Sequence, residues 1–325
     1  QQAMELLEAI AGAAEGEAVT ELYRQLGTEL KQELDRLAAA GNQKRVGEVL
    51  AAFEDFLGRL RQRSEQTFNS LIWIAETYSG LGQGATDASQ RTSFFGHAAE
   101  SYQQILQRAN ELVSDEKNRT KLIPGVTLRL ANCRRHQGNF EEAHKLLVGL
   151  ATSQPLALDV QFEAASMYQA WGKSGQVENF DKAITGVESE KILGWSQIAL
   201  YLQRLIDSRS QDAERYRARR WEARYNQLQC RIEHAQASSG AKLDQLKRAR
   251  SEIQGLMMVT ATVDPRWESR YNDAYRVILE GLGEPVISLA EYREKYKPVL
   301  TAVAPTRPVA GPAGVAAATS GTNAA

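Results

Sequence analysis

The sequence contains little of several features that mark specialised proteins. Its two cysteines, Cys133 and Cys230, are too few for a disulfide framework. No apolar run approaches the ~20 residues that cross a bilayer, so we expect no membrane span. The formal net charge of −1 excludes an overall electrostatic attraction to nucleic acid or anionic membranes. Binding to either would require a local basic patch.

A recognisable signal peptide is missing as well. The chain begins with Gln1-Gln2 and an amphipathic stretch, not with Met, a basic segment and an apolar block. We therefore expect a processed form or a part of a longer chain. The expected location is cytoplasmic unless a targeting segment precedes Gln1.

Proline is scarce, and none occurs before Pro124. Helix interiors exclude proline because its ring removes a backbone donor and clashes with the preceding turn. The proline-free stretch of 123 residues, rich in Ala, Leu, Glu, Gln and Arg, therefore predicts one helix after another. Alternation with a period of two is almost absent. Together these patterns predict an all-α fold class.

Helix boundaries near the C-terminus are also marked. Asp264-Pro265 suits a helix start, with Asp as the cap and Pro at the first position. Ser288 and Glu291 predict the capping box of a last helix that ends before Pro298.

The composition changes from about Ala304 onward. Pro, Gly, Ala and Ser dominate there, and large apolar residues vanish. Such a segment buries too little surface to offset its ordering entropy. We predict that residues 301–325 form a disordered C-terminal tail.

One stretch carries the clearest internal repeat. Leu130 and Ala131 are expected on the inner face of a first helix, and Gly138 closes that helix because glycine adopts the left-handed conformation without strain. Ala143 is the matching small residue on a second helix, and Pro155 follows its end.

Three further copies follow the same pattern. One surrounds Gly172, which lies 34 residues after the glycine of the first copy, and Lys173–Glu178 is an insertion within it. Another surrounds Gly82 and is followed by a predicted long loop over Gln83–Phe94. A weaker fourth copy lies around Gly41-Asn42, between helices expected at 22–37 and 46–60. The first-helix positions that match in the second and third copies are Ala164, Ala165, Tyr168, Leu71, Ile74, Ala75 and Tyr78.

This spacing resembles the tetratricopeptide repeat, a 34-residue helix–turn–helix unit, over roughly residues 20–190. The resemblance implies an α-solenoid of stacked antiparallel helical hairpins that binds another protein. We predict divergent repeats with inserted loops over residues 1–195. Further hairpins are expected to continue the stack over residues 196–300.

The C-terminal half has an echo of its own. The hexapeptide beginning at Trp221, Trp-Glu-Ala-Arg-Tyr-Asn, recurs 46 residues later as Trp-Glu-Ser-Arg-Tyr-Asn from Trp267. The echo predicts two more helical hairpins in which Trp and Tyr side chains lie between layers.

In the family, the first helices of successive repeats line a concave groove that receives an extended peptide or a partner helix. The resemblance places these helices at 68–81, 126–137 and 160–171. Helical spacing predicts a basic and aromatic groove that suits an acidic peptide or a C-terminal carboxylate. Leu128 replaces the lysine of the chaperone-binding subfamily, so chaperone tails are disfavoured. The predicted groove residues are Arg129, Asn132, Arg135, His136, Trp73 and Phe162, with Glu76 and Ser166 beside them.

The segment Arg204–Arg250 is locally basic, with twelve Lys or Arg against six Asp or Glu. Basic side chains interleaved with aromatic ones are typical of single-stranded nucleic-acid binding. The alternative is a helix whose arginines pair with acidic neighbours, and we favour it. The densest part of the segment contains Arg215, Arg217, Arg219, Arg220 and Arg224.

Catalytic and metal-binding motifs are lacking. Cys133 and His136 lie three apart but have no second ligand pair, and Gly172-Lys173-Ser174 lacks the first glycine of a phosphate-binding loop. We expect no cofactor, no metal and no enzymatic activity, unless the chain is the helical domain of a larger enzyme. The expected function is a protein–protein interaction scaffold. An RNA-binding helical repeat that uses residues 204–250 is the remaining alternative.

Overall fold

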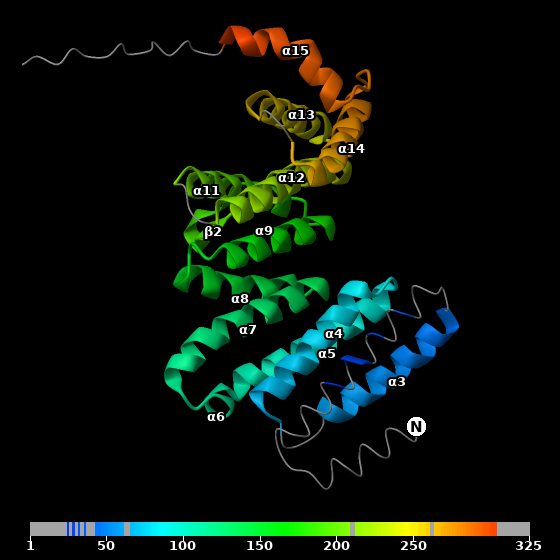
Figure 1. Ribbon diagram of the computed structural model, residues 1–325, viewed down its shortest axis with the longest axis vertical. Coiled ribbons are helices and arrows are strands. Elements are labelled where there is room, and N and C mark those ends of the chain that lie inside the picture. The colour runs from blue at the N-terminus through cyan, green and yellow to red at the C-terminus, as the bar shows by residue number, and fades with distance from the viewer. Residues whose placement is uncertain are drawn as a thin grey trace, which may run out of the picture. The chain divides into compact units, whose positions relative to one another are not determined.

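A computed structural model describes residues 43–61, 66–208, 212–260 and 263–303, together with positions 25, 28, 29, 32 and 36. These residues are mostly helical, which confirms the predicted all-α class (Figure 1). Within them, none of the helices combines the length and apolar composition needed to cross a bilayer. The predicted fourth repeat copy around Gly41-Asn42 and the tail from residue 304 lie outside the described residues. The helices are α3 (Gln43–Arg61), α4 (Phe68–Gly84), α5 (Ala88–Gln107), α6 (Ala109–Leu112), α7 (Glu116–His136), α8 (Phe140–Ser153), α9 (Leu158–Lys173), α10 (Asn179–Thr185), α11 (Trp195–Asp207), α12 (Ala213–Ala237), α13 (Lys242–Val259), α14 (Pro265–Leu282) and α15 (Leu289–Val303).

The chain divides into two compact units after Leu246. In the first unit, each helix packs mainly on its neighbours along the chain, as α4 does on α5, α5 on α7, α7 on α8 and α8 on α9 (Figure 1). Helices α11 and α12 form a further close pair. The predicted division at residue 195 falls inside this unit, at the start of α11.

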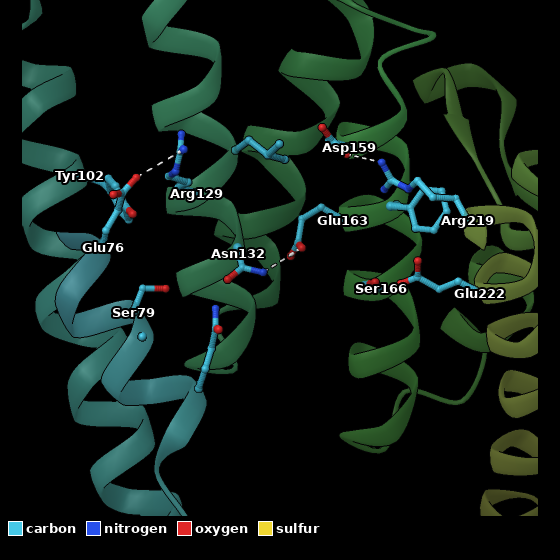
Figure 2. A pocket seen from close by; sticks show the side chains of 14 residues that line it. Glu76, Ser79, Tyr102, Arg129, Asn132, Asp159, Glu163, Ser166, Arg219 and Glu222 are labelled. Atoms are coloured by element: carbon cyan, nitrogen blue, oxygen red, sulfur yellow. Dashed lines mark hydrogen bonds and ion pairs between the residues drawn. The ribbon is translucent and has the colours of Figure 1, made fainter. Parts of the chain in front are cut away.

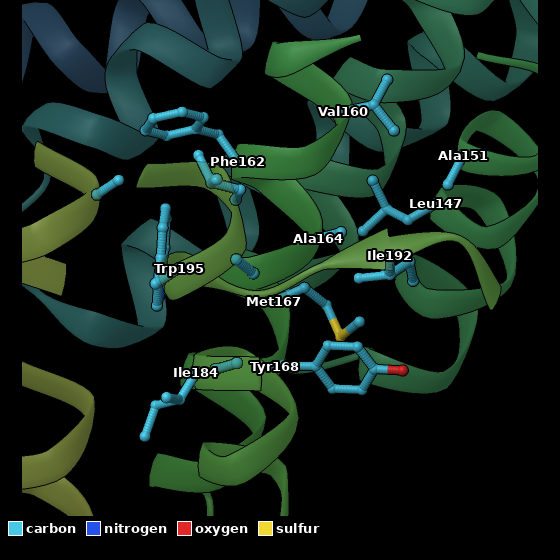
Figure 3. Close-up of a cluster of buried hydrophobic side chains, with 14 of the residues drawn as sticks. Leu147, Ala151, Val160, Phe162, Ala164, Met167, Tyr168, Ile184, Ile192 and Trp195 are labelled. Atoms are coloured by element: carbon cyan, nitrogen blue, oxygen red, sulfur yellow. The ribbon is translucent and has the colours of Figure 1, made fainter. Parts of the chain in front are cut away.

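Two hydrophobic clusters fill the first unit, and α7 contributes to both. The N-terminal cluster joins buried side chains of α3, α4, α5 and α7, including Leu130. The central cluster extends from α7 to α12 (Figure 3). Ala131 is its contribution from α7. Ala131 and Ala143 are both fully buried, as the repeat pattern predicts. Gly138 has a φ of 78°, which confirms its role in ending the helix.

Two glycine–phenylalanine contacts set how closely the helices approach. A Cβ atom on Gly82 would lie 2.9 Å from the ring of Phe95, and one on Gly172 would lie 2.8 Å from the ring of Phe180. Each glycine therefore leaves room for a ring that lies flat against its helix. Both glycines stand four residues after a buried tyrosine of the repeat pattern, so the two sites are structurally equivalent.

A small hairpin between α10 and α11 gave no signal in the sequence. Strands β1 (Gly186–Val187) and β2 (Ile192–Leu193) are antiparallel and flank the 3-10 helix η1 (Glu188–Glu190). The Gln161 side chain holds the hairpin to the start of α9, because its amide donates to the Lys191 carbonyl at 2.9 Å and accepts from the Leu193 N–H at 2.7 Å. Two-residue strands are too short to show alternation.

The predicted loop over Gln83–Phe94 is wrong. Helix α4 continues to Gly84, and α5 already begins at Ala88. The Asp87 carboxylate caps α5 by accepting the Gln90 N–H at 2.8 Å. The polar residues that suggested a loop are the exposed first turns of this helix. Where the sequence predicts an insertion over Lys173–Glu178, residues 174–178 connect α9 to α10, and Lys173 is the last residue of α9.

Two prolines lie inside helices rather than at their ends. Helix α7 begins at Glu116, ten residues before the predicted start, and contains Pro124. Helix α15 runs to Val303 and contains Pro298, so its predicted end is wrong. An interior proline costs roughly 3 kcal/mol of helix propensity, which tertiary packing can override. For α7 that packing comes from α5 and α6.

The second unit consists mainly of α13, α14 and α15. Its predicted caps are confirmed: the Asp264 carboxylate accepts the Arg266 N–H at 3.0 Å, and Ser288 and Glu291 form the capping box. The hexapeptide echo does not mark equivalent positions. Trp221 is buried in the interior of α12, whereas Trp267 is only half-buried near the start of α14.

We expect Gly172→Ala to destabilise the chain by about 1–3 kcal/mol, because the new methyl group overpacks the Phe180 ring. Gly149→Ala in α8 is the matched control. Its Cβ meets no atom within 4 Å, so the substitution should stabilise the helix by about 0.5–1 kcal/mol. Urea unfolding followed by circular dichroism measures both. Equal effects of the two substitutions would contradict the close contact.

Candidate functional site

A pocket of about 560 Å³ opens on the first unit, and residues of five helices line it (Figure 2). Helices α4, α7 and α9 are the three that the resemblance assigns to the groove. Helix α12 was not expected there, and it adds Arg219 and Glu222. Tyr102 of α5 also reaches the lining. We call this pocket the groove.

The lining residues follow helical spacing. On α4 and on α9 they occur at i, i+3, i+4 and i+7, which places each set on one face of its helix. Extending the predicted pair Phe162 and Ser166 by one turn would have found Asp159 and Glu163. The α4 set is Glu76, Ser79, Gly80 and Gln83, and the α9 set is Asp159, Phe162, Glu163 and Ser166.

Three of the six predicted groove residues line the groove, namely Arg129, Asn132 and Phe162. Arg135 and His136 lie one turn further along α7, outside the lining. Arg135 pairs there with Glu163 of the lining, and His136 packs on Phe95. Trp73 is half-buried and packs against the N-terminal cluster.

Glu163 lies at the centre of the groove and ties two helices together. Its side chain is only 13% exposed, and it pairs with Arg135, which is 16% exposed. Arg135 Nε donates to Glu163 Oε1 at 2.6 Å, and Asn132 Nδ2 donates to Glu163 Oε2 at 2.9 Å (Figure 2). One carboxylate of α9 thus binds two side chains of α7. Because the pair is mostly buried, removing either partner would leave an uncompensated charge.

Further ion pairs mark the two sides of the groove. Arg129 of α7 pairs with Glu76 of α4 at 3.4 Å, and both side chains are 51% exposed. Arg219 of α12 pairs with Asp159 of α9. The Arg219 guanidinium also lies 3.9 Å from the centre of the Phe162 ring, a cation–π contact. Helices α4, α7, α9 and α12 are therefore linked by ion pairs or hydrogen bonds across the groove.

The groove is not the basic surface that the sequence predicts. Its lining contains two guanidinium groups, those of Arg129 and Arg219, against four carboxylates. The expectation counted the α7 arginines but omitted the acidic residues that α9 and α12 bring to the same space. The omitted carboxylates are Asp159, Glu163 and Glu222, and the fourth, Glu76 of α4, is the one that the sequence placed beside the groove.

Tyr102 presents a single polar group at the groove. Its side chain is 1% exposed, and burial raises the pKa of its phenol well above 10, so the hydroxyl is protonated at neutral pH. Within the described part of the chain, this hydroxyl has no hydrogen-bond partner. The hydroxyl oxygen is not among the buried polar atoms that lack a partner, so it reaches the surface of the groove, where a bound molecule can contact it.

The five arginines of α12 do not form one patch. At about 100° per residue, they spread over opposite sides of the helix. Arg219 enters the groove, Arg217 pairs with Glu214, and Arg224 donates to the Gln227 side chain at 3.2 Å. Arg220 is half-buried, and Arg215 is exposed. Arg217 and Arg219 thus pair with acidic side chains, as the alternative interpretation of this segment predicts.

His136 packs against a ring instead of facing the groove. Its imidazole lies flat on Phe95, with ring centres 4.1 Å apart and planes 7° apart. Burial, together with the positive charges of Arg135 and Arg91, lowers the pKa of His136 to about 4. The side chain is therefore neutral at physiological pH.

This depressed pKa predicts a pH dependence of stability. Below pH 6.5 the unfolded chain takes up a proton at His136 that the folded chain binds only near pH 4, so the free energy of unfolding falls as the pH drops through that range. His136→Phe retains a ring on Phe95 without a titrating group and should flatten this part of the profile. Urea unfolding at a series of pH values measures the difference, and an unchanged slope in the variant would refute the assignment.

Among the described residues, no group of three or more His, Cys, Asp or Glu side chains is arranged to hold a metal ion. Comparisons with protein-family models, with curated proteins and with solved structures each gave no match to this chain.

Proposed function

We propose that the chain is a protein–protein interaction module, a tetratricopeptide-like α-solenoid that binds a peptide or helix of a partner in the groove. The observation that carries this proposal is the convergence of the lining faces of α4, α7 and α9 on one pocket of about 560 Å³. This size lies within the roughly 300–1,000 Å³ of typical ligand pockets.

The solenoid interpretation is supported by the order of contacts in the first unit. Packing is mostly between helices adjacent in sequence, with weaker contacts between α7 and α9 and between α9 and α12. Repeat proteins have this pattern because each unit touches only its neighbours. Such a stack offers a wide surface without requiring any segment to fold on binding.

The groove is also preorganised. Glu163, Asn132 and Arg135 restrain one another across α7 and α9, and Arg219 is held by both Asp159 and Phe162. Side chains that are already ordered lose little entropy when a partner binds. The binding energy of a partner is therefore available for affinity and specificity.

A substitution that fills the groove tests this function. Ser166 is half-buried in the lining, and Ser166→Trp places an indole in the space that a partner would occupy. We expect the variant to lose the proteins that the unmodified chain captures from a lysate of its native cells, as measured by quantitative mass spectrometry. The same substitution at Glu141, an exposed position of α8 outside the lining, should retain them. Equal capture by both variants would contradict binding in the groove.

A further inference from the structure

We propose that the groove recognises a basic peptide segment, with an arginine or lysine side chain of the partner received between Glu76 and Tyr102. The proposal rests on the proposed function and names the chemistry of its partner. It reverses the acidic partner that the sequence predicts.

The first argument is the charge of the lining. Four carboxylates line the groove against two guanidinium groups, and Arg135 pairs with Glu163 from outside the lining, so one negative charge remains in excess and the groove attracts cations more strongly than anions. Because several of these groups are partly shielded from water, their field is stronger inside the groove than on an open surface.

The second argument is independent of charge and concerns Tyr102. Its hydroxyl makes no hydrogen bond within the described residues, and its oxygen is open to the groove instead of buried. Figure 2 shows Tyr102 beside Glu76 and Arg129. A guanidinium or ammonium group in this corner would donate to the Tyr102 oxygen and to the Glu76 carboxylate together.

The third argument concerns Arg129, which is the present ion-pair partner of Glu76. This ion pair is 3.4 Å long, and both side chains are half exposed, so it contributes little to stability. A cation of the partner can replace Arg129 at Glu76 at small cost. The pair between Glu163 and Arg135 is mostly buried and would remain in place.

Fluorescence anisotropy with the full chain tests the proposal. The probes are three short labelled peptides of one Gly-Ser-Leu frame that carry arginines, glutamates or glutamines at the same positions. We expect the arginine peptide to bind about tenfold more tightly than the glutamine peptide, and the glutamate peptide to bind most weakly. Raising the salt concentration should reduce this preference.

Two substitutions at the same ion pair give opposite predictions. Glu76→Gln should weaken binding of the arginine peptide by about tenfold, because it removes the negative charge that the arginine pairs with and puts an NH2 donor in place of one carboxylate oxygen. Arg129→Gln should tighten binding several-fold, because it removes the competing cation. A damaged fold cannot produce the tightening. Glu141→Gln makes the same chemical change as Glu76→Gln at an exposed position outside the lining and should leave binding unchanged.

Three results would overturn the proposal. The glutamate peptide binds most tightly of the three, the arginine peptide does not bind, or the Arg129→Gln variant binds the arginine peptide more weakly than the unmodified chain does. None of these results decides whether the groove binds a partner protein at all. That broader function is tested separately, by the loss of captured proteins in the Ser166→Trp variant. If that variant loses its partners while the arginine peptide shows no preference, the groove binds a partner of different chemistry. If it keeps them, the proposed function fails first.

Discussion

Helix α7 packs into both hydrophobic clusters and also lines the groove, so the structure of the first unit depends on this helix. One face supplies Leu130 to the N-terminal cluster, and the neighbouring face, about 100° around the helix, supplies Ala131 to the central cluster. A third face supplies Arg129 and Asn132 to the groove. The small side chain of Ala131 lets the other residues of the central cluster pack close to the α7 backbone. Because the same helix joins the two clusters and carries the groove, the position of its polar face is determined by the packing of its apolar ones.

The Glu163 carboxylate extends this constraint from α7 to α9. It binds Asn132 and Arg135 from a mostly buried position, and this interaction fixes the relative placement of α7 and α9. Breaking such a buried pair strongly destabilises a fold, because it leaves a buried charge without a partner. The exposed pair between Glu76 and Arg129 differs in kind, since water screens it. The groove thus combines a rigid centre with a side that can exchange partners, which is an arrangement suited to binding.

Much of the fold was predictable because it follows from local rules. Gly138 ends its helix and Asp264-Pro265 begins one, as their intrinsic preferences dictate. The errors arose where packing overrides those preferences, as at Pro124, or where a polar helix start resembled a loop, as before Phe94. For the groove, spacing within each helix found Arg129, Asn132 and Phe162. The contributions of Tyr102 and Arg219 depend on which helices meet in space, and no pattern within one helix contains that information.

Site-specific photo-cross-linking tests the central claim, binding in the groove, most directly. A photoreactive amino acid at position 166 would lie within the groove, and one at position 141 would lie on an exposed face of α8 outside the lining. The account predicts that a captured partner is cross-linked from position 166 and not from position 141. Cross-linking from position 141 alone would contradict it.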